Sequence, residues 1–187
     1  MTVLLILLAA FSGVFVLADS DGYFCTGNGY LAYEMRWVGE KSSHILTIVR
    51  FGKDIGIEQL APVELEEFQT HGMTCGRDFI KISAWSDSYY VDISDIDNPT
   101  LVADDLAHEV TSAGHQGNLG HGSDESVLDL KAGDTGGRFQ LVILKASHPS
   151  QRGIEHFTVT ELIQRDSREE ILRRHRLFTG IFLETID

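Results

Sequence analysis

The chain has 187 residues, 43% of them hydrophobic, and carries a formal net charge of −13. This length suits one domain with a sizeable core. A strongly acidic surface repels phosphate backbones and anionic lipid headgroups, so the charge argues against nucleic acid and membrane surfaces as partners. Cations or basic proteins suit such a surface better, and acidity alone also keeps an exported protein soluble.

An uncharged apolar segment, residues 3–18, opens the chain. Val16 and Ala18 stand at the two small-residue positions that signal peptidase reads before a cleavage site. A membrane-spanning helix needs about 18 or more apolar residues, so this run is short for an anchor. Because no Lys or Arg precedes it, an uncleaved anchor remains the alternative. We expect a cleaved signal peptide over residues 1–18 and a single β-rich domain over 19–187 in a secreted or periplasmic protein.

Two cysteines, Cys25 and Cys75, lie in the predicted mature part. In an oxidising compartment the simplest arrangement is one disulfide between them. A redox or metal-binding pair would instead favour C-x-x-C spacing, which the sequence lacks. We therefore predict a Cys25–Cys75 disulfide.

Strand patterns dominate the rest of the chain, because short apolar stretches alternate with polar turns. Residues 138–147 contain a continuous apolar run, typical of a strand buried on both faces. Each cysteine is followed by a polar step and a hairpin, a faint internal repeat. The other predicted strands pair as hairpins over residues 29–38 with 44–51, 79–85 with 88–94, and 155–164 with 171–186.

One segment, residues 98–114, is predicted to contain a short helix. Asn98 suits the N-cap position and Pro99 the first helical position. Val102, Leu106 and Val110 follow at intervals of four residues, and Gly114 suits the C-terminal cap.

The predicted tip of the last hairpin concentrates positive charge on an otherwise acidic chain. Such a tip can recognise an anion or an acidic partner, and it can also be a charged hairpin end that reaches into water and blocks strand aggregation. We favour the second interpretation and keep Arg173, Arg174 and Arg176 as candidate partner-binding residues. The arginines concerned are Arg165, Arg168, Arg173, Arg174 and Arg176.

The stretch GHQGNLGHGSDE, residues 114–125, is the candidate metal site. Its histidines and the preceding His108 lack the H-E-x-x-H spacing that places two imidazoles one helical turn apart. A glycine-rich loop could still bring such side chains to one ion, with a carboxylate as a further ligand. The candidate ligands are His108, His115, His121 and Asp124.

Other short motifs are weaker. The run GDTGG at 133–137 resembles fragments of two protease motifs, but it lacks a suitably placed histidine motif and a second carboxylate loop. The aspartates of DISDIDN at 92–98 fail the EF-hand positions, so only an irregular calcium site is an alternative there. Nucleotide-binding and hydrolase-elbow motifs are absent from the sequence.

These patterns predict an all-β fold, mainly an antiparallel sandwich or barrel of about eight to ten strands with one short helix. A small propeller-like arrangement of hairpin units is the alternative. We expect an exported, non-catalytic binding or structural module without a cofactor. Binding of a protein partner is one role that such a module could have. A metal-dependent hydrolase that uses the histidine loop with Ca or Zn is the competing hypothesis.

Overall fold

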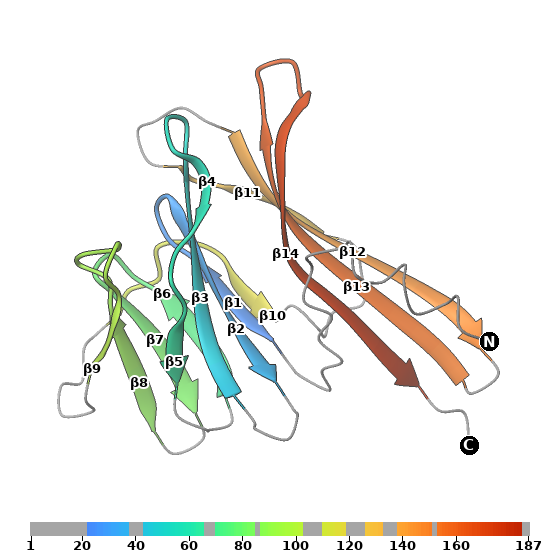
Figure 1. The fold of residues 1–187 in the computed structure, drawn as a ribbon, viewed down its shortest axis with the longest axis horizontal. Coiled ribbons are helices and arrows are strands. Elements are labelled where there is room, and N and C mark those ends of the chain that lie inside the picture. The colour runs from blue at the N-terminus through green and yellow to red at the C-terminus, as the bar shows by residue number, and fades with distance from the viewer. Residues whose placement is uncertain are drawn as a thin grey trace, which may run out of the picture.

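The computed structural model describes fourteen β-strands and no helix within its described ranges (Figure 1). The predicted all-β, antiparallel, sandwich-like class is confirmed. The strand number exceeds about ten because several strands have only three or four residues, too short to stand out in a sequence pattern. The described ranges are residues 22–37, 43–65, 70–84, 87–102, 110–118, 126–132, 138–150 and 153–184.

The strands form three antiparallel sheets, and the first of them lies between the other two (Figure 1). We call it the central sheet. Its strands are β1 (Tyr23–Thr26), β2 (Tyr30–Trp37), β3 (Ser43–Gly52), β4 (Gly56–Gln59), β5 (Val63–Leu65), which pairs with β3, and β10 (Gln116–Asn118), which pairs with β1.

The second and third sheets are each a four-stranded meander in chain order. The second contains β6 (Thr70–Cys75), β7 (Phe79–Ala84), β8 (Ser88–Asp92) and β9 (Thr100–Val102). The third contains β11 (Ser126–Leu130), β12 (Arg138–Ser150), β13 (Gly153–Arg165) and β14 (Ile171–Glu184).

Two-residue alternation lets the central sheet serve two cores. On β2, Leu31 and Tyr33 belong to the core shared with the third sheet, whereas Tyr30 and Ala32 belong to the core shared with the second. Successive side chains of a strand point to opposite faces, so a largely apolar β2 is what a sheet covered on both sides requires. Figure 1 shows this order, with the second and third sheets on opposite sides of the central sheet.

The predicted hairpins 29–38 with 44–51 and 79–85 with 88–94 are confirmed as β2–β3 and β7–β8. The last hairpin is confirmed as β13–β14, with a register shift between Thr160 and Glu161. Residues 139–143 of β12 are all buried, which confirms the prediction of a strand buried on both faces.

The predicted helix at 98–114 is wrong where it can be compared. Residues 100–102 form β9, in which Val102 pairs with Tyr90 of β8, and residues 110–114 have no regular structure. Asn98 does not cap a helix, because its amide side chain donates to Asp95 in a turn. Pairing with an open sheet edge therefore outweighs local helix propensity. Residues 103–109 lie outside the described ranges.

The internal repeat has a counterpart in two similar hairpin turns. The amide of Gly27 donates to Tyr30 O at 2.9 Å after β1, and the amide of Gly76 donates to Phe79 O at 2.9 Å after β6. The sheets are not arranged as propeller blades, however, because the second and third meanders pack on opposite faces of the first. The sandwich prediction holds, and the propeller alternative does not.

The predicted signal peptide, residues 1–18, lies outside the described ranges. Across the part of the chain that is described, no helix has the length and apolar character needed to cross a membrane.

Candidate functional site

The predicted disulfide is confirmed and joins the central sheet to the second sheet. Cys25 on β1 bonds to Cys75 on β6, and each cysteine is 1% exposed. The bond therefore links the two sheets near the C-terminal ends of β1 and β6, just before the two similar hairpin turns.

An irregular segment, residues 110–115, crosses beside the disulfide, and we call it the crossing segment. The amide of Ala113 donates to Cys75 O at 2.8 Å. The amide of Thr26 donates to His115 O at 2.7 Å, and the amide of His115 donates to the hydroxyl of Thr26 at 2.7 Å. The segment is thus fixed to the residues of both cysteine strands by backbone hydrogen bonds.

Close backbone approach at this junction requires glycine. A Cβ on Gly76 would lie 2.7 Å from Cγ1 of Val110 and 3.0 Å from Phe79 O. A Cβ on Gly114 would overlap Thr26. These glycines let the crossing segment lie directly on the β1 and β6 ends.

The larger cleft opens where the hairpin turns, the loop after β8 and the crossing segment meet. Its volume is about 550 Å³, within the range of small-molecule sites. Four lining side chains are mainly apolar and three are polar, the composition expected of a site that holds an apolar body and orients a polar group. The lining residues are Asn28, Tyr30, Gly76, Arg77, Ile93, Ser94, Ile96 and Ala113.

Tyr30 forms a fixed part of this cleft. The residue is 3% exposed, and its hydroxyl donates to Gly76 O at 2.6 Å. Burial, with a smaller contribution from the negative charge of Asp78, raises the pKa of Tyr30 well above its usual range. The phenol stays protonated at neutral pH and does not act as a general base.

A smaller cleft of about 190 Å³ lies between the crossing segment and the end of β11. His115 contributes its imidazole, whose Nε2 atom lies 3.2 Å from Asp129 O. The contact is to a backbone carbonyl and orients the ring. The lining residues are Thr26, Gly27, Ala113, Gly114, His115, Asp129 and Lys131.

Of the four predicted metal ligands, the structure places only His115. His108, His121 and Asp124 fall in stretches outside the described ranges, as does the GDTGG run at 133–137. Among the residues that are described, no three His, Cys, Asp or Glu side chains lie close enough to hold a metal ion. The histidine-loop hypothesis therefore remains a prediction.

The aspartates of 92–98 accept protein donors in the structure. Asp92 accepts from the amide of Ser94, and Asp95 accepts from the Asn98 side chain. Asp97 pairs with Nη1 of Arg50 at 2.6 Å, which links the loop after β8 to the central sheet. These carboxylates therefore stabilise the loop after β8 through contacts within the protein. The contacts do not support the calcium alternative.

The candidate partner-binding arginines make contacts inside the chain. Nη1 of Arg174 and Nη2 of Arg176 lie 3.6 and 3.2 Å from the carboxylate of Glu161, whose side chain is 7% exposed. The guanidinium of Arg173 packs against Gly56, the first residue of β4. Arg174 and Arg176 thus compensate a carboxylate on β13, and Arg173 helps to join the third sheet to the central one.

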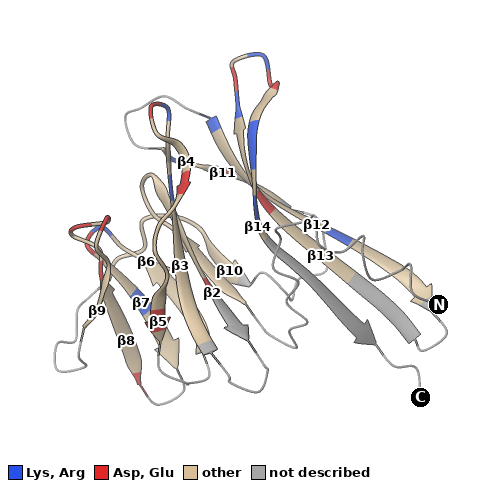
Figure 2. Ribbon diagram, viewed as in Figure 1, with Lys and Arg blue, Asp and Glu red and all other residues tan. Residues whose placement is uncertain are grey.

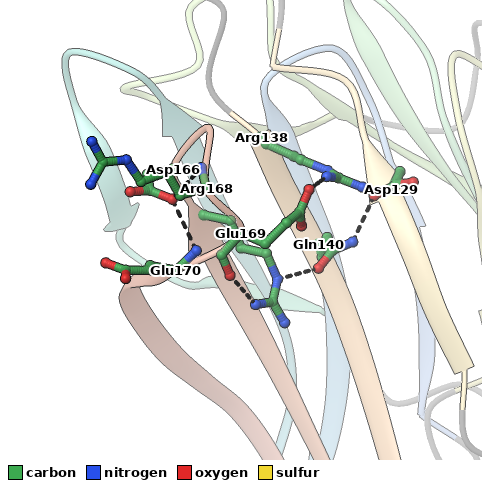
Figure 3. Close-up of polar contacts among 8 residues, drawn as sticks. Asp129, Arg138, Gln140, Asp166, Arg168, Glu169 and Glu170 are labelled. Atoms are coloured by element: carbon green, nitrogen blue, oxygen red, sulfur yellow. Dashed lines mark hydrogen bonds and ion pairs between the residues drawn. The ribbon is translucent and has the colours of Figure 1, made fainter.

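The β13–β14 tip carries both signs of charge, as Figure 2 shows. Nε of Arg165 donates to Oε1 of Gln140 at 2.6 Å. Nε2 of Gln140 in turn donates to Oδ1 of Asp129 at 2.8 Å (Figure 3). Arg138 forms an ion pair with Glu169 at the tip. The tip is therefore tied to β11 and β12 by a polar network, in which carboxylates balance the predicted basic charge.

A buried hydrogen-bonded pair, Glu34 and His44, was not predicted from the sequence. Nε2 of His44 on β3 lies 2.9 Å from Oε2 of Glu34 on β2, and the two side chains are 4% and 5% exposed. The two-residue alternation of side chains along β2 could have indicated that Glu34 is buried, because Glu34 shares a strand face with the buried Tyr30 and Ala32. A carboxylate in such a position needs a buried partner.

Comparison with known proteins finds no matching family model, no matching curated protein and no matching solved structure.

Proposed function

We propose that this chain is an exported, non-catalytic binding module whose ligand occupies the larger cleft beside the Cys25–Cys75 disulfide. Export is supported by the signal-like residues 1–18. It is also supported by the disulfide, which is compatible with an extracellular or periplasmic location.

The composition of the cleft carries the binding proposal. Arg77 and Tyr30 are the ionisable side chains among the lining residues. Both keep one protonation state at neutral pH, Arg77 because guanidinium is always charged and Tyr30 because its phenol is buried. Such a pair can hold and orient a ligand, but it supplies neither a general base nor an activated nucleophile.

The arrangement of the cleft supports a preformed site. Its walls come from the β1–β2 turn, the β6–β7 turn, the loop after β8 and the crossing segment. The amide of Ile93 donates to Asp78 O at 2.8 Å, and the amide of Ala113 donates to Cys75 O at 2.8 Å. A site held by hydrogen bonds and a disulfide loses little entropy when it binds a ligand.

A cleft-filling substitution tests the proposal. Ala113 is exposed and lines the cleft, so Ala113→Trp should obstruct it without disturbing the core. The matched control is Ala146→Trp, at an exposed position on β12. A small-molecule library is screened by thermal unfolding of both variants and the wild type.

Ligands of the cleft stabilise the folded state, so they should raise the Tm of the wild type and of A146W but not of A113W. The proposal is wrong if no compound raises the wild-type Tm, or if every stabilising compound acts equally on A113W.

A further inference from the structure

The guanidinium of Arg77 has no ion-pair partner within the described part of the chain. Arg50 pairs with Glu58 and Asp97, and Arg138 pairs with Glu169. Arg77, in contrast, is exposed on the β6–β7 turn and lines the larger cleft.

The rest of the lining divides into an apolar part and a polar rim. Tyr30 and Ile93 are buried, so the accessible apolar surface comes from the partly buried Ile96 and the exposed Ala113. Exposed Asn28, Arg77 and Ser94 contribute an amide, a guanidinium and a hydroxyl to the polar rim. A ligand that suits this arrangement has an apolar body and one end that accepts hydrogen bonds.

The charge of Asp78 restricts where a negative group can sit. This carboxylate lies close enough to Tyr30 to help raise the pKa of the phenol. A second negative charge beside the phenol would meet the same repulsion, whereas one at Arg77 would meet an opposite charge. The other exposed carboxylates are screened over about 8 Å at physiological ionic strength.

We propose that the larger cleft binds a small organic carboxylate, with its carboxylate on the guanidinium of Arg77 and its apolar body against Ile96 and Ala113. The planar guanidinium donates two parallel hydrogen bonds to a carboxylate, a stronger contact than a neutral hydrogen bond. This inference rests on the proposed function and adds the chemical class of the ligand.

The test uses the disulfide-bonded protein and three acids, hexanoate, phenylacetate and phenylpropionate, each beside its uncharged amide. Amide chemical shifts in two-dimensional NMR report binding at Gly76, Arg77, Ser94 and Ala113. At least one acid should shift these signals and bind up to about fivefold more tightly than its amide, the factor expected for an ion pair at an exposed arginine.

Three variants locate the contact. Arg77→Ala should reduce binding of the acid to the level of its amide, and Arg77→Lys should give an intermediate affinity because the paired donors are lost. The control Arg168→Ala removes an exposed arginine at the β13–β14 tip and should leave the affinity unchanged.

Equal binding of acid and amide within the cleft would overturn the carboxylate inference and leave the binding module intact. Retention of wild-type acid affinity by R77A would overturn it as well. If no acid shifts the cleft signals, the inference also fails, and the A113W screen then decides the proposed function separately.

Discussion

His44 and Glu34 form a hydrogen-bonded pair, 2.9 Å apart, inside the sheet that serves both cores. They are diagonal neighbours, because Arg36 is opposite His44 and Leu46 is opposite Glu34 in the β2–β3 register. Loss of either member removes a hydrogen bond between two buried side chains, which costs more than the hydrogen bond contributes net. The pair therefore constrains how β2 aligns with β3.

The first prediction concerns this pair. Glu34→Ala should destabilise the protein by about 1–3 kcal/mol, because the buried His44 imidazole loses its hydrogen bond to the carboxylate. The double variant Glu34→Leu, His44→Leu should be more stable than either single leucine variant, since two apolar side chains suit this face. Denaturant unfolding of the four proteins measures the coupling, and additive effects would contradict a paired role.

The second prediction concerns the disulfide between Cys25 and Cys75, which are separated by 50 positions in the chain. Closing a loop of this length stabilises a fold by about 4 kcal/mol in the chain-entropy model. The C25A/C75A variant should lose stability of this order in denaturant unfolding without reductant. Adding dithiothreitol should lower the wild-type stability toward that of the variant, and a wild type indifferent to reductant would contradict the prediction.

The third prediction concerns the contact between Gly56 and Arg173. Gly56 has φ of +71°, and a Cβ there would lie 2.7 Å from Cζ of Arg173. Gly56→Ala should cost about 1–2 kcal/mol from the left-handed backbone alone, with a further cost from displacing the guanidinium. The same substitution in an Arg173→Ala background should cost less. Equal costs in both backgrounds would show that the guanidinium does not pack there.

The fourth prediction concerns His175 on β14. Burial lowers the pKa of its imidazole, and its Nε2 atom is buried without a hydrogen-bond partner in the described structure. Because the unfolded chain takes up the proton more readily, stability should fall as the pH drops through about 6.5, the unperturbed histidine value, toward the lower folded-state value.

His175→Gln removes this titration while it keeps a polar side chain. The dependence of the unfolding free energy on pH between neutrality and mild acid should therefore be weaker in H175Q than in the wild type. An identical pH dependence in the two proteins would contradict a depressed pKa at His175.

The fifth prediction concerns the histidine loop. We expect a chelator to leave the Tm of the purified protein unchanged, because binding and not metal catalysis is proposed. Bound zinc or calcium, together with a lower Tm in chelator, would instead support the hydrolase hypothesis through His108, His115, His121 and Asp124. The triple variant H108A/H115A/H121A would then lose the metal.

Features that depend on local pattern could be predicted from the sequence. The turn signals and apolar alternation around 44–51 and 79–94 are enough to place two hairpins, because each strand pairs with its neighbour in the chain. The disulfide could also be predicted, because a chain with an export signal and only two cysteines allows a single intramolecular pairing. The apolar run of β12 predicts burial on both faces, and residues 139–143 have it.

Features that depend on tertiary contact could not be predicted. The larger cleft combines Asn28, Arg77, Ser94 and Ala113, which come from four separate segments, and no spacing rule relates them. The helix prediction failed at residues 100–102 because the edge of β8 was available for pairing. The Glu34–His44 contact depends on the β2–β3 register, which an isolated glutamate in a strand does not specify.

The proposed export requires the chain to fold outside the reducing cytosol. Intact-mass spectrometry of protein recovered from the periplasm or medium, unfolded in denaturant and alkylated with iodoacetamide with and without prior reduction, tests this most directly. We predict a chain that begins at Asp19, takes up no alkyl group without reduction and takes up one at each of Cys25 and Cys75 after reduction. A chain that retains residues 1–18, or alkylation of either cysteine without reduction, would contradict it.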